Sequence, residues 1–425
     1  MRRVVILGAG YAGLHAFSAM RSRLRLMLAR KEVELIVVSR DPHHTYHGWT
    51  GEVLTGDLDV GSTLTPLAPI LGESFVQGDV VAADLGGQTL TVRTEAGERQ
   101  LAYDHLVIAA GSSDPFDRIG GLSEHGWCVK DTRDMQKLVA ELENWNGAAP
   151  DPRNVVVVGG GLAGVETASA LAARFGKNQG GKINVHLVSS SDKLLPTLRP
   201  DFNHIADTAT RTLADQGVQL HRGAKVTQIM DDHVQLADGR TLSSDMAIVA
   251  AGMSFRTLPG TEALPRNAAG QIFADKSLRV SGRNNIWVAG DIAAVPHPVT
   301  GEPCPANALW AMKQGDCLGR NVARALKGQS LKRFNFKGLG QAAGLAGQRG
   351  ITELWRLQFT GRLAWMIRIL FFAWYMPSRR RALPILSQLT GHLWAATAGA
   401  AFQGKPIEAP AAEVTPVADL SQRLR

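Results

Sequence analysis

Cysteine is scarce in this chain of 425 residues. The three cysteines, Cys128, Cys304 and Cys317, lie far apart and form no CxxC pair. This spacing excludes a disulfide framework and a cysteine zinc site, and it suits a reducing cytoplasm. His43, His44 and His47 are close together, but no carboxylate or cysteine cluster accompanies them. We therefore predict no metal site, and we interpret this histidine segment as a loop near a bound cofactor.

Long apolar runs are also missing. The most apolar segment, residues 363–376 (LAWMIRILFFAWYM), contains one charged residue, Arg368. As a helix it would measure roughly 21 Å, which is short of the roughly 30 Å hydrocarbon core of a membrane. No signal peptide is expected either, because residues 1–3 lead at once into a strand-like VVIL. The sequence therefore predicts no transmembrane helix.

Acidic residues are nearly absent from the C-terminal region. Residues 331–400 contain ten Lys and Arg and one acid, Glu353, so their net charge is +9. The net charge of the whole chain is +8, so the rest of the chain sums to −1. Apolar faces with tryptophan and flanking arginines are typical of a monotopic anchor on an anionic membrane surface. The alternative is a buried helix at a homodimer interface. Nucleic-acid binding is not expected, because no nucleic-acid module accompanies the basic residues.

Two glycine motifs provide the strongest positive signal. Each lies between an apolar strand-like run and a helical segment, and together they comprise Gly8, Gly10, Gly13, Gly159, Gly161 and Gly164. Such glycines allow a tight turn, close approach of the backbone to a pyrophosphate, and close packing of helix on strand. The N-terminus of the following helix then binds phosphate. The chain therefore has two predicted dinucleotide sites.

The same order of elements follows each motif. A second apolar strand, at residues 34–39 and again at 184–189, precedes an antiparallel meander and then a strand with small residues at its end. These small residues, which allow a ligand close to the backbone, are Ala110, Gly111 and Gly252. We therefore interpret the chain as two copies of one nucleotide-binding module.

The residues at the ends of the second strands depart from the usual pattern. An acid normally binds the ribose there, but this chain has Ser39 and Arg40 in the first module and Ser189 in the second. The first carboxylate is absent or moved to Asp41. Ser189, with Lys193 and Arg199 nearby, can accommodate a 2′-phosphate, so NADPH remains open beside NADH; the alternative is a serine-rich surface turn.

Residues 285–291 (NIWVAGD) form one more apolar strand, which ends in Asp291. A carboxylate at this end of a central strand lies in the ligand crevice and can accept hydrogen bonds from a ribityl chain. Alternatively, Asp291 caps a following helix. A further helix begins near Ala308, and the N–H groups at its start can stabilise negative charge on a reduced ring system.

Together these motifs resemble the two-dinucleotide-binding flavoprotein oxidoreductases, in which one module holds FAD and an inserted module holds NAD(P)H. Within that group the chain resembles the type II NADH:quinone oxidoreductases, through GGGLAGVETA, NIWVAGD and the C-terminal FTGRLAWMIRILFFAWYM followed by RRR. The absence of cysteine from residues 40–59 argues against the soluble disulfide reductases, which need a CxxxxC there. An isolated Cys128 argues against sulfide:quinone reductases, which use a cysteine pair.

The resemblance implies an α/β fold with two Rossmann-like domains and a C-terminal helical membrane-associating region. The expected parts are an FAD domain at residues 1–120 and 280–328, an NAD(P)H domain at 121–279, an anchoring or dimerisation region at 329–402, and a disordered tail at 403–425.

The resemblance also implies roles for individual residues. Glu166 matches a family glutamate near the nicotinamide and flavin, with an orienting or proton-handling role; the alternative is an acid that complements the helix dipole. Lys130 matches a family lysine of unassigned task. The family's quinone helix carries two glutamines where this chain has Leu309 and Lys313, so Ala308 and Leu309 are expected beside the flavin and Lys313 near the flavin or the quinone.

The resemblance therefore implies a non-proton-pumping enzyme that passes a hydride from NAD(P)H to FAD and two electrons to a membrane quinone, ubiquinone or menaquinone. It would lie peripherally on the cytoplasmic side of the cell membrane. Two alternatives remain open: a reductase with a soluble or sulfur acceptor, and a slow-turnover redox-sensing flavoprotein.

Overall fold

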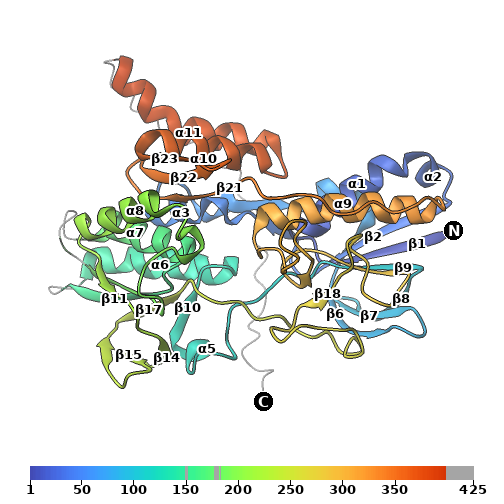
Figure 1. Ribbon diagram of the computed structural model, residues 1–425, viewed down its shortest axis with the longest axis horizontal. Helices are drawn as coiled ribbons and strands as arrows, with labels where there is room; N and C mark the ends of the chain where they lie inside the picture. The colour runs from blue at the N-terminus through green and yellow to red at the C-terminus, as the bar shows by residue number, and fades with distance from the viewer. Residues whose placement is uncertain (149–151, 177–180, 182, 399–425) are drawn as a thin grey trace.

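The computed structural model describes residues 1–148, 152–176, 181 and 183–398 (Figure 1). The tail predicted at residues 403–425 lies outside this range. Within the described residues the chain builds two five-stranded parallel sheets, three antiparallel sheets of three strands, two sheets of two strands, and a C-terminal helical layer.

The first parallel sheet contains strands from both ends of the chain. Its order is β5-β2-β1-β9-β19, with bounds Phe75–Gln77, Val33–Ser39, Arg2–Leu7, His105–Ile108 and Ile286–Val288. Helices α1 (Tyr11–Arg23) and α9 (Ala308–Leu326) pack against each other beside it, and α2 (Arg25–Ala29) follows α1. The central β1 is apolar because it is buried on both faces, with Val4, Val5 and Ile6 inaccessible to solvent.

The second parallel sheet repeats this arrangement. Its order is β13-β12-β11-β17-β10, with bounds Gln219–His221, Ile183–Val188, Arg153–Val158, Met246–Val249 and Gly126–Cys128. The accompanying helices are α6 (Thr132–Ala148), α7 (Leu162–Phe175) and α8 (Asn203–Asp215). In both sheets the strand order reverses beside the strand that precedes the glycine motif, which is where doubly wound folds bind ligands. The predicted repeat of one α/β module is confirmed.

Each module also contains the predicted antiparallel meander. The first comprises β6 (Asp79–Asp84), β7 (Thr89–Thr94) and β8 (Gly97–Ala102), and the second β14 (Val226–Ile229), β15 (His233–Leu236) and β16 (Thr241–Ser243). Two short helices lie in connecting segments: α4 (Ala68–Leu71) between β4 (Leu64–Pro66) and β5, and α5 (Leu122–His125) between β9 and β10.

The chain returns to the first module earlier than residue 280. Leu264, Ile272 and Leu278 belong to the core of the first module, and β18 (Ile272–Phe273) pairs with β20 (Ala293–Ala294). The expected boundary at 279/280 is therefore too late, because these apolar residues are buried against the first sheet before β19 begins.

The histidine segment is not the loop that its polar composition suggested. It forms β3 (His43–Thr45), a 3₁₀ turn (His47–Trp49) and α3 (Thr50–Thr55), and β3 pairs with β4 (Leu64–Pro66). The interpretation was wrong because the apolar residues interspersed in the segment, including Trp49 and Leu54, are buried in the core of the second module.

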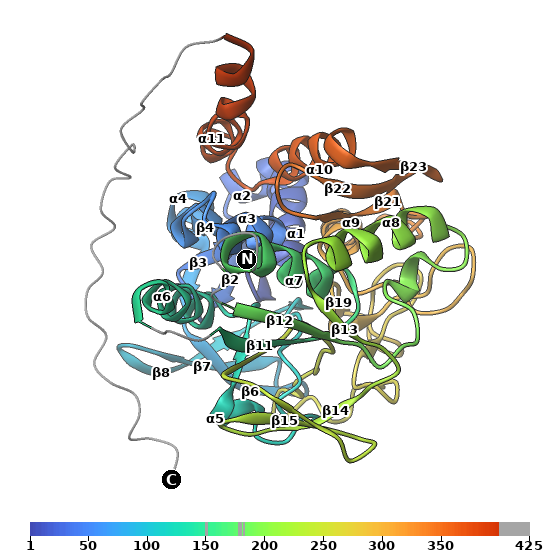
Figure 2. The same cartoon turned by 90° about the vertical axis from the view of Figure 1, so that its left-hand side faces the viewer.

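The C-terminal layer comprises β21 (Gly340–Gly344), β22 (Gly350–Leu354), β23 (Leu357–Thr360), α10 (Gly361–Tyr375) and α11 (Arg379–Ala398) (Figure 2). One side of α10 packs into the core of the second module through Trp365, Ile369 and Ala373. Its other side exposes Leu363, Met366, Leu370 and Trp374. Among the described helices, none combines the length and apolarity that crossing a membrane requires.

Candidate functional site: two dinucleotide cradles and a buried charge triad

The first glycine motif forms a tight cradle between β1 and α1. Gly8 has φ +102°, and a Cβ there would lie 2.4 Å from the carbonyl oxygen of Ala109. A Cβ on Gly13 would lie 1.8 Å from the carbonyl oxygen of Gly8, so only glycine allows the helix this close to the turn. Gly10 is the N-cap of α1 and has no side-chain cap, which leaves the first N–H groups of the helix for a phosphate.

The second motif has the same features as the first. Gly159 has φ +130° and its Cβ would lie 2.7 Å from the Ala251 Cβ, while that of Gly164 would lie 1.8 Å from the Gly159 carbonyl oxygen. Gly161 caps α7 without a side-chain hydrogen bond, and a Cβ there meets nothing within 4 Å. Both cradles therefore have the turn, the helix packing and the free N–H groups that a pyrophosphate needs.

The end of β2 carries the residues expected at the first ribose. The Ser39 carbonyl accepts a hydrogen bond from the Gly78 N–H, and Arg40 beside it is exposed. Asp41 forms an exposed ion pair of 3.1 Å with Arg133 of α6. The carboxylate of Asp41, the alternative ribose ligand, is therefore held toward the second module and not at the end of β2.

The corresponding end of β12 is organised by serines. Ser189 is buried, and its Oγ donates to the Ser191 carbonyl and accepts from the Ser191 N–H. Lys193 is exposed. The sequence suggested that Arg199 could bind a 2′-phosphate. Its guanidinium is instead occupied, because it donates hydrogen bonds to Asp207 at 2.6 Å and to Asn203 at 2.7 Å.

A polar chain joins the two modules at Asp291. The Ser112 Oγ donates to Asp291 Oδ2 at 2.8 Å, and the Lys130 Nζ donates to that Oγ at 3.1 Å. Ser112 follows Ala110 and Gly111 at the end of β9, whereas Lys130 comes just after β10. The helix-cap alternative for Asp291 is wrong, because the short strand β20 follows it and not a helix.

Gln314 fixes the backbone before Asp291. Its buried side-chain oxygen accepts from the Gly290 N–H at 2.8 Å, and Gly290 has φ +82°. Sequence reasoning missed Ser112 and Gln314. Only the Ser-Ser pair after the small-residue strand and a polar residue among the apolar ones on the inner face of α9 could have indicated them.

The histidine segment lies against the first cradle. His44 is buried, its Nδ1 bonds to the Ala9 carbonyl at 3.2 Å, and burial lowers its pKa to about 3. His47 Nε2 bonds to the Lys130 carbonyl at 2.9 Å, and its N–H donates to the Tyr11 hydroxyl. Within the described residues no group of His, Cys, Asp and Glu side chains could hold a metal ion.

The start of α9 is capped by its own chain. The Asn307 side chain accepts from the Trp310 N–H at 3.2 Å, and Ala308 and Leu309 follow as half-buried residues. The Lys313 Nζ lies 5.3 Å from the Tyr375 ring centre and 5.9 Å from that of Phe336. Lys313 therefore lies near two aromatic rings, of which that of Tyr375 belongs to α10 in the C-terminal layer.

Glu166 belongs to a buried charge triad. Arg368 of α10 contacts Glu52 of α3 at 2.6 Å and Glu166 of α7 at 3.0 Å, and the Gly344 N–H donates to Glu166 at 2.6 Å. Arg368 is 2% exposed and Glu52 6%. Burial raises the pKa of Glu166, although Arg368 and the Gly344 N–H act in the opposite direction. The helix-dipole alternative does not apply, since the first turn of α7 contains no acid.

Cys128 is buried in the core of the second module, as interpreted from its isolation. Gly252, with φ +78°, lies beyond β17 and faces Pro115. Ser113 and Ser254 pair their backbones between the same two connections, which brings the two modules together at this point.

Two dinucleotide cradles on one chain, with the Asp291 carboxylate between them just beyond β19, define a two-dinucleotide-binding flavoprotein oxidoreductase; β19 is an edge strand of its sheet and not the central strand that was expected. The chain belongs to the pyridine nucleotide-disulphide oxidoreductase family, whose model matches residues 2–315. The predictions of this enzyme class, of its Rossmann-type fold and of its FAD and NADH cofactors are confirmed.

Relatives of known activity match most of the chain. It is 26% identical to the demethylphylloquinone reductase NdbB of Synechocystis sp. over 90% of this chain and 94% of the relative. It is also 26% identical to the type II NADH:quinone oxidoreductase of Staphylococcus aureus, over 85% and 92%. The structure of NDH2 from Plasmodium falciparum in complex with NADH matches with a TM-score of 0.81 at 16% identity, over 92% of this chain and 98% of that one.

Proposed function

We propose that this protein oxidises NADH or NADPH and reduces a membrane quinone, without pumping protons. In this proposal the first module and the return of the chain to it hold FAD, the second module holds NAD(P)H, and the C-terminal layer meets the quinone and the membrane. FAD, when bound, supplies the two-electron chemistry between the nucleotide and the quinone.

The residues of the first cradle suit FAD. The N–H groups of α1 beyond Gly10 would bind the pyrophosphate, Ser39 and Arg40 would lie at the ribose, and Ala110 and Gly111 would allow close approach of the ring system. Asp291 would accept hydrogen bonds from ribityl hydroxyls, with Ser112 and Lys130 holding its carboxylate in place.

In the second cradle the N–H groups beyond Gly161 would bind the NAD(P)H pyrophosphate, and Gly252 would line the nicotinamide side. Ser189 supports either nucleotide, because it has no charge to repel a 2′-phosphate and no carboxylate to bind a 2′-hydroxyl.

The observation that carries the proposal is the buried triad of Glu52, Glu166 and Arg368. It connects the second cradle's helix with α10, the helix whose other side is exposed and apolar. Quinone reduction consumes two protons, and a largely buried glutamate with a raised pKa can hold one of them. Glu166 is therefore the proposed proton carrier.

The exposed side of α10 supports a peripheral membrane position. Leu363, Met366, Leu370 and Trp374 recur at helical spacing along it. Arg362 is exposed at the start of α10, and Arg380 is exposed at the start of α11, which follows. Burial of each such leucine in lipid is worth about 1.5–3 kcal/mol. We propose that this side rests on an anionic surface, on the cytoplasmic side of the cell membrane.

Stopped-flow absorbance of the purified yellow protein tests the function. The flavin is reduced with NADH or NADPH and then mixed with a soluble ubiquinone or menaquinone analogue. We expect rapid bleaching followed by rapid reoxidation, and the faster nucleotide identifies the physiological one. Bleaching without reoxidation by either quinone would refute quinone as the acceptor.

A second candidate is a reductase of a soluble acceptor. It is favoured by Leu309 and Lys313, which stand where the related enzymes carry glutamines, and by the position of Lys313 against Phe336 and Tyr375. In the same experiment it predicts that a soluble oxidant, and no quinone, restores the flavin absorbance.

A further inference from the structure

More than half of the residues that line a cavity at the far end of the first module are cations. The cavity measures about 260 Å³ and lies between the C-terminal ends of α1 and α9. Its charged side chains are those of Arg23, Arg320, Arg324, Lys327 and Lys332, and no described acidic residue lines it. This volume is below the roughly 300–1,000 Å³ of sites that enclose small molecules, which favours a headgroup bound at the surface.

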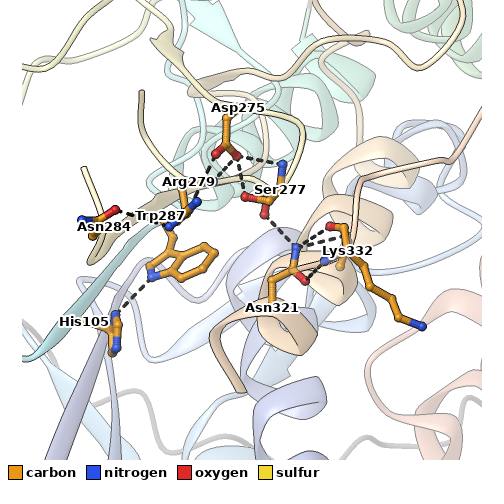
Figure 3. A network of polar contacts seen from close by, with 9 residues as sticks. His105, Asp275, Ser277, Arg279, Asn284, Trp287, Asn321 and Lys332 are labelled. Atoms are coloured by element: carbon orange, nitrogen blue, oxygen red, sulfur yellow. Dashed lines mark hydrogen bonds and ion pairs between the residues drawn. The ribbon is translucent and has the colours of Figure 1, made fainter. Parts of the chain in front are cut away.

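The back of the cavity is rigid. Asn321 is fully buried, and its Nδ2 donates to the carbonyls of Ser277 at 2.9 Å and Lys332 at 2.8 Å. Its Oδ1 accepts from the Lys332 N–H at 2.9 Å. Figure 3 shows Asn321 between Ser277 and Lys332, with the Lys332 side chain extending away from this network. The segment that carries Lys332 is therefore fixed against α9.

Part of the positive charge has a structural role. The Lys327 Nζ donates to the Arg23 carbonyl at the end of α1, and Arg324, in the last turn of α9, donates through its Nε to the Ser330 carbonyl beyond that helix. Arg320 pairs with Asp316 at 3.4 Å. The side chains of Arg23 and Lys332 have no acidic partner among the described residues, and a multiply charged anion would relieve their mutual repulsion.

The cations continue onto α2. Residues 20–31 (MRSRLRLMLARK) contain five Arg and Lys and no acid, although the charge of the chain outside residues 331–400 sums to only −1. Leu26, in the middle of this segment, is 66% exposed. An exposed leucine among arginines is typical of a surface that contacts lipid. In both views α2 and α10 lie at similar height in the upper part of the molecule, with α11 rising above them (Figures 1 and 2).

We propose that this cavity binds the phosphate headgroup of an anionic phospholipid, so that the first module contacts the membrane at α2 independently of α10. Arg23 and Lys332 supply the charge, and Leu26 enters the lipid beside them. The two contacts hold the molecule at two separate points and thereby fix its orientation on the surface. This contact is additional to the one proposed for α10.

The test compares R23Q/K332Q with R99Q/K225Q, both in the full-length holoenzyme. Arg99 of β8 and Lys225 beside β14 are exposed cations on the meanders, so the control removes the same charge elsewhere. Binding to phosphatidylcholine vesicles with and without phosphatidylglycerol is measured by flotation, and binding of inorganic phosphate by calorimetry. Turnover is followed with a soluble quinone analogue.

We expect R23Q/K332Q to bind the anionic vesicles about thirty-fold more weakly, or about five-fold for each cation, and the control to change less than two-fold. An equal loss in both variants would mean general charge attraction and overturn the site. Unchanged vesicle binding, with or without loss of phosphate binding, would overturn the lipid assignment. Turnover should stay unchanged in both variants, so a failure of quinone reduction would refute the proposed function and not this site.

Discussion

Replacing Arg368 by methionine should destabilise the protein strongly. Arg368 is 2% exposed and lies between the buried Glu52 and the largely buried Glu166, so its removal leaves both carboxylates without their cation. Breaking a buried ion pair in this way costs about 3–5 kcal/mol. With an unfolding entropy of about 2.1 cal/mol/K per residue, this cost lowers the Tm of a chain of 425 residues by about 3–6 °C.

The loss should depend on pH in a defined direction. Burial raises the folded-state pKa of Glu166 above its unfolded value, and removing Arg368 removes the main opposing effect. A carboxyl group with a raised pKa favours folding when protonated, so this contribution is fully present below its unfolded pKa and is lost as the pH rises through the folded pKa. The destabilisation of R368M should therefore be larger at pH 8 than at pH 5.

Thermal unfolding of R368M, E52Q/R368M and R362M separates this effect from loss of an arginine in general. Arg362 is exposed on the same helix, so R362M should change the Tm by less than about 1 °C. E52Q/R368M should recover part of the loss, since one uncompensated carboxylate is gone. A Tm shift of R368M no larger than that of R362M, or one that does not vary with pH, would refute the argument.

Three further predictions concern the site. E166Q should slow flavin reoxidation by quinone about 100-fold or more while NADH reduces the flavin at the normal rate, as measured by stopped flow; equal slowing of both steps would contradict a proton-carrying role. G164A should abolish NADH binding but retain FAD, because its Cβ would lie 1.8 Å from the Gly159 carbonyl oxygen; this is checked by nucleotide titration of the yellow protein. S189D should shift the kcat/KM ratio toward NADH over NADPH by about tenfold or more, because a carboxylate binds the 2′-hydroxyl and repels a 2′-phosphate; an unchanged ratio would place the ribose elsewhere.

Local patterns of the sequence were sufficient for the modules and their cradles. Apolar runs followed directly by glycines at fixed spacing identify a buried parallel strand, a tight turn and a helix N-terminus, since each requirement acts within about fifteen residues. Such patterns also predicted the repeat of the module and the strand before Asp291, although β19 ends at Val288. They failed for the histidine segment, where Trp49 and Leu54 are buried by residues far away in the chain.

Only the tertiary structure brought distant charges together. Arg368 is 316 residues from Glu52 in sequence, and no local pattern relates them. The cavity between α1 and α9 likewise brings Arg23 and Lys332 together, although they lie in distant parts of the sequence. The sequence by itself therefore determined the two nucleotide-binding modules, because short-range sterics and burial specify them. The packing of segments that are distant in the sequence decided which carboxylates share the buried Arg368 and where the basic surface lies.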